Sequence, residues 1–300
     1  MFGISLPQSF LQMNTIFISI LIEALPFVTL GVLVSGIIQI FVTEEMITKI
    51  MPKNQLLAVI FASLLGMFFP SCECGIVPIV KRLVAKGVPI SAGVAFMLTA
   101  PIINPVVLFA TYIAFGSDWR MALYRAGGAL VVSLIVGSLI ASFYKGNPLK
   151  MEEVHYHEHH HHHAHEKASF WKKVWQTLEH SVEEFFSMGK YLIIGSLIAA
   201  AVQTFIKTST LVSIGHGQAS SSLVMMALAF ILSLCSEADA FIASSFRTTF
   251  STGSLLAFLL FGPMIDLKNL LMMFAAFKKR LVFMIISSVT AVVFLYSLFF

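Results

Sequence analysis

The chain has 300 residues, of which 58% are hydrophobic and 11% are charged, and its mean hydropathy is +0.89. This composition leaves too little polar surface to cover a water-soluble globule, so it excludes an ordinary soluble domain and predicts an all-α polytopic protein of the cell membrane. The formal net charge of +4 is modest. It gives no reason to expect a nucleic-acid partner.

Four apolar stretches are long enough to cross the hydrocarbon core as uninterrupted helices, which need about 20 residues each. They are residues 16–40, 121–143, 185–205 and 281–300. Four more are apolar but broken by polar or helix-breaking residues: 56–84, 90–115, 223–246 and 255–276. Counting each stretch as one crossing predicts about eight transmembrane helices, with broken helices at the polar motifs.

The two halves of the chain resemble each other. Matching residues lie 162 to 164 positions apart, and they keep the same order: Gly31 and Gly195, Cys72 and Cys235, Pro101 and Pro263, Asn104 and Asp266. The pattern predicts two repeats of four helices, residues 1–144 and 185–300, joined by a polar linker at 145–184. Four crossings per repeat predict parallel repeats, whereas an odd number would invert them.

The first broken stretch is interrupted by Cys72, Glu73 and Cys74. A carboxylate at the centre of a membrane helix costs about 2.5 to 3.5 kcal/mol, so it indicates a substrate or ion path. Thiolate and carboxylate ligands suit a borderline-soft cation such as zinc. Cysteine also packs well at helix crossings, and packing alone is the alternative explanation, above all for Cys235.

Paired breaks in both halves predict one central site, because irregular backbone at membrane depth must be buried in protein or line a watery cavity. The expected substrate-binding residues are Cys72, Glu73, Cys74, Asn104, Cys235, Glu237, Asp239 and Asp266. The expected helix breaks are Pro70, Gly75, Pro101, Pro105, Gly262 and Pro263. The nearest basic candidates are Lys190, Arg247 and Lys268, while Glu23 is expected near a helix end.

The linker contains a histidine-rich tract followed by an amphipathic segment at 167–186. Neutral imidazole binds zinc, copper and nickel, so the tract is interpreted as a loose metal-capturing or sensing element, with a disordered spacer as the alternative. The expected metal ligands are Cys72, Glu73, Cys74, His155, His157, His159, His160, His161, His162, His163 and His165.

Residues 68–79 contain Ser-Cys-Glu-Cys-Gly, and residues 98–105 contain Ala-Pro-Ile-Ile-Asn-Pro. Together they resemble the YraQ-like predicted permeases, a group that includes the ArsP organoarsenical efflux permeases. The resemblance covers nearly the whole chain. It implies a permease of about eight helices and does not name a substrate.

The expected function is therefore transport of a metal or metalloid species, with zinc as the first candidate, and not enzymatic catalysis. Efflux of an organoarsenical or another small solute is the alternative within transport. A membrane thiol oxidoreductase using Cys72 and Cys74, or a subunit that anchors a partner, would belong to another class. The expected partners are the lipid bilayer, the carried ion or solute, an accessory membrane or extracytoplasmic subunit, and a second copy of the chain.

Overall fold

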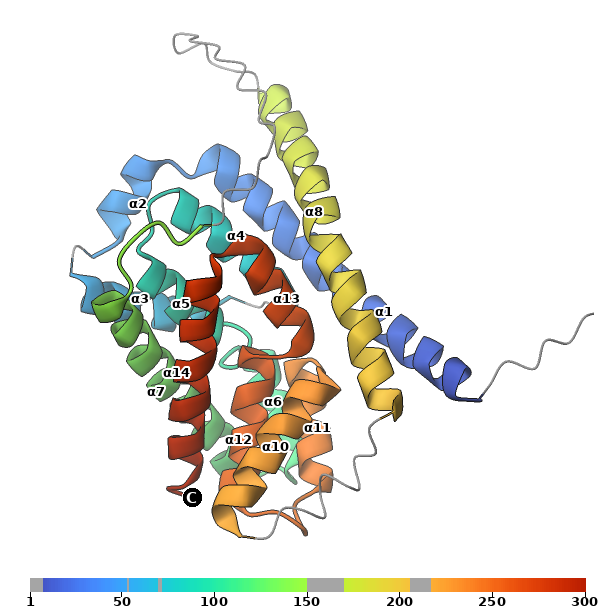
Figure 1. The fold of residues 1–300 in the computed structure, drawn as a ribbon. Helices are drawn as coiled ribbons and strands as arrows, with labels where there is room; N and C mark the ends of the chain where they lie inside the picture. The colour runs from blue at the N-terminus through green and yellow to red at the C-terminus, as the bar shows by residue number, and fades with distance from the viewer. Residues whose placement is uncertain (1–7, 53, 70–71, 150–169, 206–216) are drawn as a thin grey trace, which may run out of the picture.

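The computed structural model describes residues 8–52, 54–69, 72–149, 170–205 and 217–300, and within them the chain is helical (Figure 1). The first half contains α1 (Gln8–Phe41), α2 (Glu44–Ile50), α3 (Gln55–Gly66), α4 (Glu73–Ala85), α5 (Ile90–Thr99), α6 (Pro105–Ala114) and α7 (Trp119–Phe143). The second half contains α8 (Phe170–Phe205), α10 (Gln218–Leu232), α11 (Ser236–Ser245), α12 (Thr252–Met264), α13 (Leu267–Ala276) and α14 (Lys279–Ser297). The all-α prediction is confirmed.

Five segments of the described chain are long and apolar enough to cross a membrane. They are α1, α7, residues 174–205 of α8, the α12–α13 pair taken together, and α14. The remaining apolar helices, such as α3, α5, α6 and α10, have only 10 to 17 residues. A chain with this pattern is a multi-pass membrane protein with broken helices, as predicted.

Helices α7 and α14 hold corresponding places in the two halves, yet they run in opposite directions. At one end, the amide of Lys278 donates to the carbonyl of Pro148 at 2.9 Å. At the other end, the hydroxyl of Tyr296 donates to the carbonyl of Tyr124 at 2.9 Å. Corresponding helices in parallel repeats would point the same way, so the prediction of parallel repeats is wrong and the relation is an inverted one.

The α10–α11 pair turns back instead of crossing. Helix α10 begins beside the start of α12, where the hydroxyls of Ser221 and Ser254 lie 2.8 Å apart. Helix α11 begins beside the end of α12: a Cβ added to Gly262, late in α12, would lie 2.7 Å from Asp239 Oδ2 in the first turn of α11. The loop 246–251 then returns the chain to the start of α12. The pair therefore enters and leaves on one side as a hairpin.

The α3–α4 pair forms the equivalent hairpin in the first half. Helices α3 and α5 end together, since a Cβ on Gly66 would meet the Thr99 side chain, and the turn 86–89 joins the end of α4 to the start of α5. Helix α5 starts beside the last part of α7, and α12 starts beside the end of α14. Because α7 and α14 run in opposite directions, these two starting points lie on opposite sides, and so the two hairpins enter from opposite sides. In Figure 1, α4 occupies the upper part of the molecule and α11 the lower part.

Helices α5 and α6 together make one broken crossing. A Cβ on Gly137, late in α7, would lie 3.3 Å from Ala95 in α5, whereas Thr111 in α6 contacts Arg125, early in α7. Each helix has 10 residues, so the pair spans about 30 Å, the thickness of the hydrocarbon core. The eight membrane-inserted elements of the described chain are thus six crossings and two hairpins.

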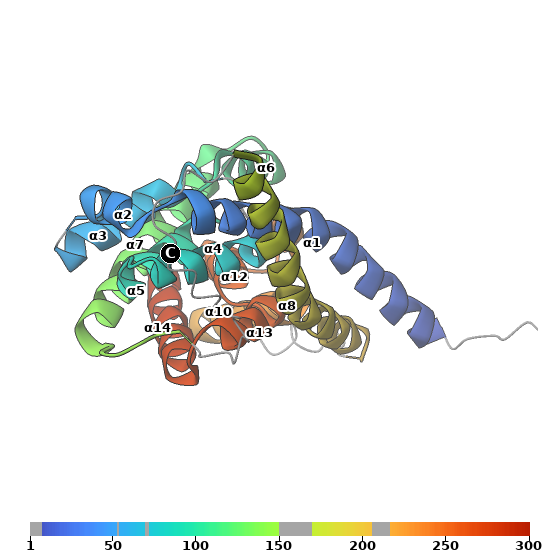
Figure 2. The same cartoon turned by 90° about the horizontal axis from the view of Figure 1, so that it is seen from above.

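Helices α1 and α8 pack against each other on one side of the molecule, away from α3, α5, α7 and α14 (Figure 2). Their contact is close because Gly36 leaves space for α8: the hydroxyl of Ser181 donates to the carbonyl of Val32 at 3.1 Å. The buried carboxylate of Glu184 joins them further, accepting from Ser35 at 2.6 Å and from Arg82 of α4 at 3.1 Å. This pair covers α4 and α13, and so closes one side of the central region.

Candidate functional site

Four short helices, α4, α6, α11 and α13, begin in the interior of the molecule. Asn104 caps α6 by accepting from the amide of Val107 at 2.9 Å, and Asp266 caps α13 by accepting from the amide of Asn269 at 2.6 Å. Cys72 and Cys235 occupy the N-cap positions of α4 and α11 without a side-chain capping bond. Helix N-termini carry partial positive charge and free N–H groups, so these breaks present polar backbone to the centre of the membrane.

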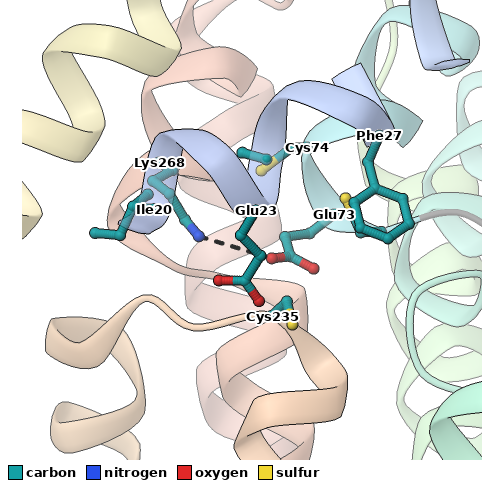
Figure 3. A pocket seen from close by; sticks show the side chains of 9 residues that line it. Ile20, Glu23, Phe27, Glu73, Cys74, Cys235 and Lys268 are labelled. Carbon is teal, nitrogen blue, oxygen red and sulfur yellow. Dashed lines mark ion pairs between the residues drawn. The ribbon is translucent and has the colours of Figure 1, made fainter. Parts of the chain in front are cut away.

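A small cavity lies where α4, α11, α13 and α1 meet (Figure 3). It is lined by Ile20, Glu23, Ala24, Phe27, Cys72, Glu73, Cys74, Cys235 and Lys268. We call it the cysteine cavity, because the three cysteines of the chain all line it and all are free thiols. Two come from one hairpin and the third from the opposed hairpin, so the fold joins thiols that are far apart in sequence.

The ammonium group of Lys268 lies between two carboxylates at the cavity. Its Nζ is 3.5 Å from Asp266 Oδ2 and 3.9 Å from Glu73 Oε1, the ion pair drawn as a dashed line in Figure 3. All three side chains are at most 3% exposed, so each charge depends on the others for compensation. A fixed cation therefore already occupies the position between Glu73 and Asp266.

A second buried ionic cluster lies next to the N-terminus of α11. Arg125 of α7 is completely buried and donates to Thr111 Oγ1 at 2.7 Å and to the carbonyl of Ser236 at 3.0 Å. Asp239 is also completely buried, and neither of its carboxylate oxygens has a hydrogen-bond partner among the described residues. A buried arginine and a buried acidic residue thus lie at the same half-helix at membrane depth.

The structure gathers only part of the predicted site. Cys72, Glu73, Cys74 and Cys235 line the cysteine cavity, and Asp266 adjoins it through Lys268. The side chains of Asn104, Glu237 and Asp239 do not line it. Asn104 and Asp266, expected to bind substrate, use one side-chain oxygen each as helix caps.

Two of the expected breaks fall where they are predicted, and three do not. Pro101 lies in the turn between α5 and α6, and Pro105 is the first residue of α6. Gly75, Gly262 and Pro263 lie inside helices, so the second-half break begins at Ile265. Pro70 lies outside the described residues.

The predicted metal ligands are only partly described. Cys72, Glu73 and Cys74 lie together at the start of α4, while the histidines at 155, 157, 159–163 and 165 lie outside the described residues. In the part of the chain that the structure describes, no three His, Cys, Asp or Glu side chains are grouped so that they could hold a metal ion.

Two of the expected basic partners lie elsewhere. Lys190 and Arg247 are exposed, and each contacts an aromatic ring, that of Tyr191 and that of Phe115 respectively. Arg125 is not among the expected basic partners, although an arginine just inside the apolar stretch 121–143 is the kind of residue that marks a buried polar contact. Glu23 lies at the cavity, inside α1 and not near its end.

Opposed hairpins and buried polar groups where half-helices begin are features of membrane permeases. A family model described as a predicted permease, of the ArsP type, matches residues 9–300. The chain belongs to this predicted permease family, and membership supports a transporter rather than an enzyme.

Three related proteins show how widely the family extends. The UPF0718 protein YcgR of Bacillus subtilis is 62% identical over 286 residues, covering 95% of this chain and 96% of that protein. A Streptococcus mutans protein, named as a candidate subunit of a two-component membrane permease complex, is 46% identical over 295 residues, covering 98% and 96%. UPF0718 protein MJ0584 of Methanocaldococcus jannaschii is 23% identical over 141 residues, covering 46% and 38%. No solved structure matches the chain.

Proposed function

We propose that the chain is a permease that carries a small sulfur-binding species, a soft metal or metalloid, through the cysteine cavity. One observation supports this proposal above the others: Cys72, Cys74 and Cys235 reach one interior cavity from two opposed hairpins. Thiol sulfur is the ligand that soft metals and metalloids prefer. Simple packing of cysteine would not require three of them at the same cavity.

Lys268 favours a carried species with little positive charge of its own, although Glu23 and Glu73 also line the cavity. Lys268 already fills the cation position between Glu73 and Asp266, and the helix N-termini at Cys72 and Cys235 add partial positive charge. A neutral trivalent metalloid with an organic substituent would bind through sulfur without displacing the lysine. Organoarsenical-type solutes are therefore the substrate class we propose first.

A divalent cation such as zinc is the second candidate. Glu73 Oε2 has no hydrogen-bond partner among the described residues, and a carboxylate oxygen next to thiols is a suitable zinc ligand. In this version, Lys268 must move away when zinc arrives, and the histidine tract would collect the ion before entry. The cost of displacing a buried ammonium makes this version weaker.

Alternating access follows from the two hairpins. The α3–α4 hairpin separates the cysteine cavity from one side of the membrane, and the α10–α11 hairpin separates it from the other side. Movement of one hairpin at a time, as one half rocks against the other, would expose the thiols to each side in turn. Proton binding by a buried carboxylate such as Asp239 would supply the coupling to a proton gradient.

We also propose that the permease works with a second membrane subunit. The name of the streptococcal relative describes that protein as part of a two-component membrane permease complex, and it covers 98% of this chain. A membrane subunit that only anchors a partner remains the alternative from another class. It would assemble normally without needing its cysteines.

The test is transport by inverted membrane vesicles, with accumulated arsenic and zinc measured by mass spectrometry after addition of a trivalent methylated arsenical or of zinc. The variants are Cys72→Ser, Cys74→Ser and Cys235→Ser, with Ser142→Ala on the outer part of α7 as control. We expect each cysteine variant to lose arsenical transport and the control to keep it. Normal transport by Cys235→Ser would refute a site shared by both hairpins, and cysteine-dependent quinone reduction without transport would favour the oxidoreductase.

A further inference from the structure

Helices α6 and α11 pack together and present one side outward, which we call the α6/α11 face. Its outward side chains are Val106, Phe109 and Ile113 of α6 and Phe241 and Ile242 of α11, which are 37% to 60% exposed. Exposed apolar side chains are ordinary on a surface that meets lipid, so they alone indicate no partner. The polar groups next to them indicate whether this face meets lipid or another protein.

The equivalent pair, α4 and α13, is covered by α1 and α8 where its helices begin. All residues of α4 from Glu73 to Val80 are buried, and Lys268, Asn269 and Met272 of α13 are buried as well. Helix α1 covers α4 so closely that a Cβ on Gly31 would collide with the backbone of Gly75. Helix α8 covers α13, where a Cβ on Gly195 would lie 3.1 Å from the Lys268 Cα. No described helix covers α6 and α11 in this way.

The α6/α11 face consequently exposes the break at the start of α11. Cys235, the N-cap residue, faces the cysteine cavity, whereas Glu237 and Ala238 in the first turn of α11 are partly exposed. Among the described residues, Glu237 makes no hydrogen bond and no ion pair with a side chain, and Arg125 acts on it only from beyond ion-pair distance. Hydrocarbon cannot satisfy a carboxylate, so Glu237 at this depth requires protein or water next to it.

We propose that the α6/α11 face is the docking surface for transmembrane helices of a second, different membrane subunit. This inference rests on the partner in the proposed function and assigns it a location. The expected partner presents an apolar helix with small residues, which can approach Ala238 as α1 approaches Gly75, and a hydrogen-bond donor or cation opposite Glu237. A symmetric pair of this chain fits less well, because it would bring two Glu237 carboxylates together across the axis.

Site-specific photocrosslinking in membranes of the native host tests the assignment. The photoreactive amino acid p-benzoylphenylalanine replaces Phe109 or Phe241 on the face, and Phe283 of α14, which is 61% exposed, is the matched control. We expect both face positions to crosslink to one integral membrane protein, identified by mass spectrometry as different from this chain. The control position, Phe283, should not crosslink to that protein. Deleting the gene of the identified protein should remove the crosslinked product at Phe109 and Phe241.

A second variant tests the energetic role of the face. Ala238→Phe should abolish co-purification of the identified subunit, whereas Ala141→Phe on the outer part of α7 should not, and thermal unfolding should confirm that both variants fold. Adducts at twice the 33.0 kDa mass of the chain would assign the face to a second copy and overturn the proposal, as would adducts to lipid alone. Crosslinking does not depend on transport, so failure of the proposed substrate would leave this test intact.

Discussion

Arg125 shows how much a single buried residue stabilises this fold. Its guanidinium joins α7 to α6 through Thr111 and to α11 through the carbonyl of Ser236. Removing one partner from a buried charged network leaves the remaining groups uncompensated, which costs about 3 to 5 kcal/mol. The fully buried Asp239 of α11 would lose the positive charge of Arg125, which acts on it.

We therefore expect Arg125→Ala to lower the thermal unfolding midpoint in detergent by about 5 °C or more. Arg120→Ala is the control, since that side chain is exposed on the first turn of the same helix and should change the midpoint little. Equal effects of the two substitutions would show that the interactions of Arg125 do not stabilise the protein.

We expect Lys268 to determine which charge the cysteine cavity accepts. Replacing it with glutamine removes the ammonium group that lies within 4.0 Å of both Glu73 and Asp266, while keeping a side chain of similar length. We expect Lys268→Gln to bind zinc about tenfold more tightly or better, a gain of about 1.4 kcal/mol, because the cation no longer competes with the metal. The measurement is competition with a chromophoric chelator.

The histidine tract must be replaced by serine in every sample of that experiment, so that only the interior site is measured. Lys190→Gln is the control, because Lys190 is exposed and lies over the ring of Tyr191. An unchanged zinc affinity in Lys268→Gln would remove the argument that the lysine excludes divalent cations.

At the scale of elements, the approach of α1 to α4 depends on two glycines. A Cβ on Gly31 would collide with the Gly75 backbone, and a Cβ on Gly75 would lie 2.7 Å from the carbonyl oxygen of Phe27. Neither backbone can yield without moving a whole helix, and overpacking of this kind typically costs about 1 to 3 kcal/mol. Because α1 contributes Glu23 and Phe27 to the cysteine cavity, separating the helices would also change the site.

We expect Gly31→Ala to lower the unfolding midpoint and to reduce transport. Gly189→Ala in α8 is the matched control: nothing lies within 4 Å of its Cβ, and alanine is favoured over glycine in a helix by about 0.5 to 1 kcal/mol. That control should unfold at the same temperature as the wild type or higher. Destabilisation of equal size in both variants would refute the close-packing explanation.

The same elements show what sequence reasoning can find. The broken stretches were recognisable because Cys72, Glu73, Asn104 and Asp266 are polar residues within long apolar runs, where each has a large energetic cost. Hydropathy has no direction, however, so it could not tell a hairpin from a crossing. The sequence therefore predicted the eight inserted elements and not that two of them turn back. Lys268 could be named as a candidate partner, but its position between two acids depends on packing between the halves.

At the scale of the whole molecule, the side of the membrane on which each loop lies depends on whether the two hairpins turn back or cross. Each half has three crossings in the structure, so the chain segment after α7 lies on the opposite side from the start of α1, and the end of α14 returns to the first side. Four crossings per half would instead place the central linker on the same side as both ends. The side occupied by the linker thus distinguishes the two arrangements.

We expect reporters fused after Lys145 and after Phe300 to indicate opposite sides of the membrane. Alkaline phosphatase is active only outside the cytoplasm and green fluorescent protein matures efficiently only inside it, so each fusion site should be positive for one reporter and negative for the other, in opposite senses. The described contacts require this result, because Pro148 pairs with Lys278 at one end of α14 while Tyr124 pairs with Tyr296 at its other end. The same reporter pattern at both sites would mean four crossings per half, and the opposed hairpins that bring the three cysteines together would then be wrong.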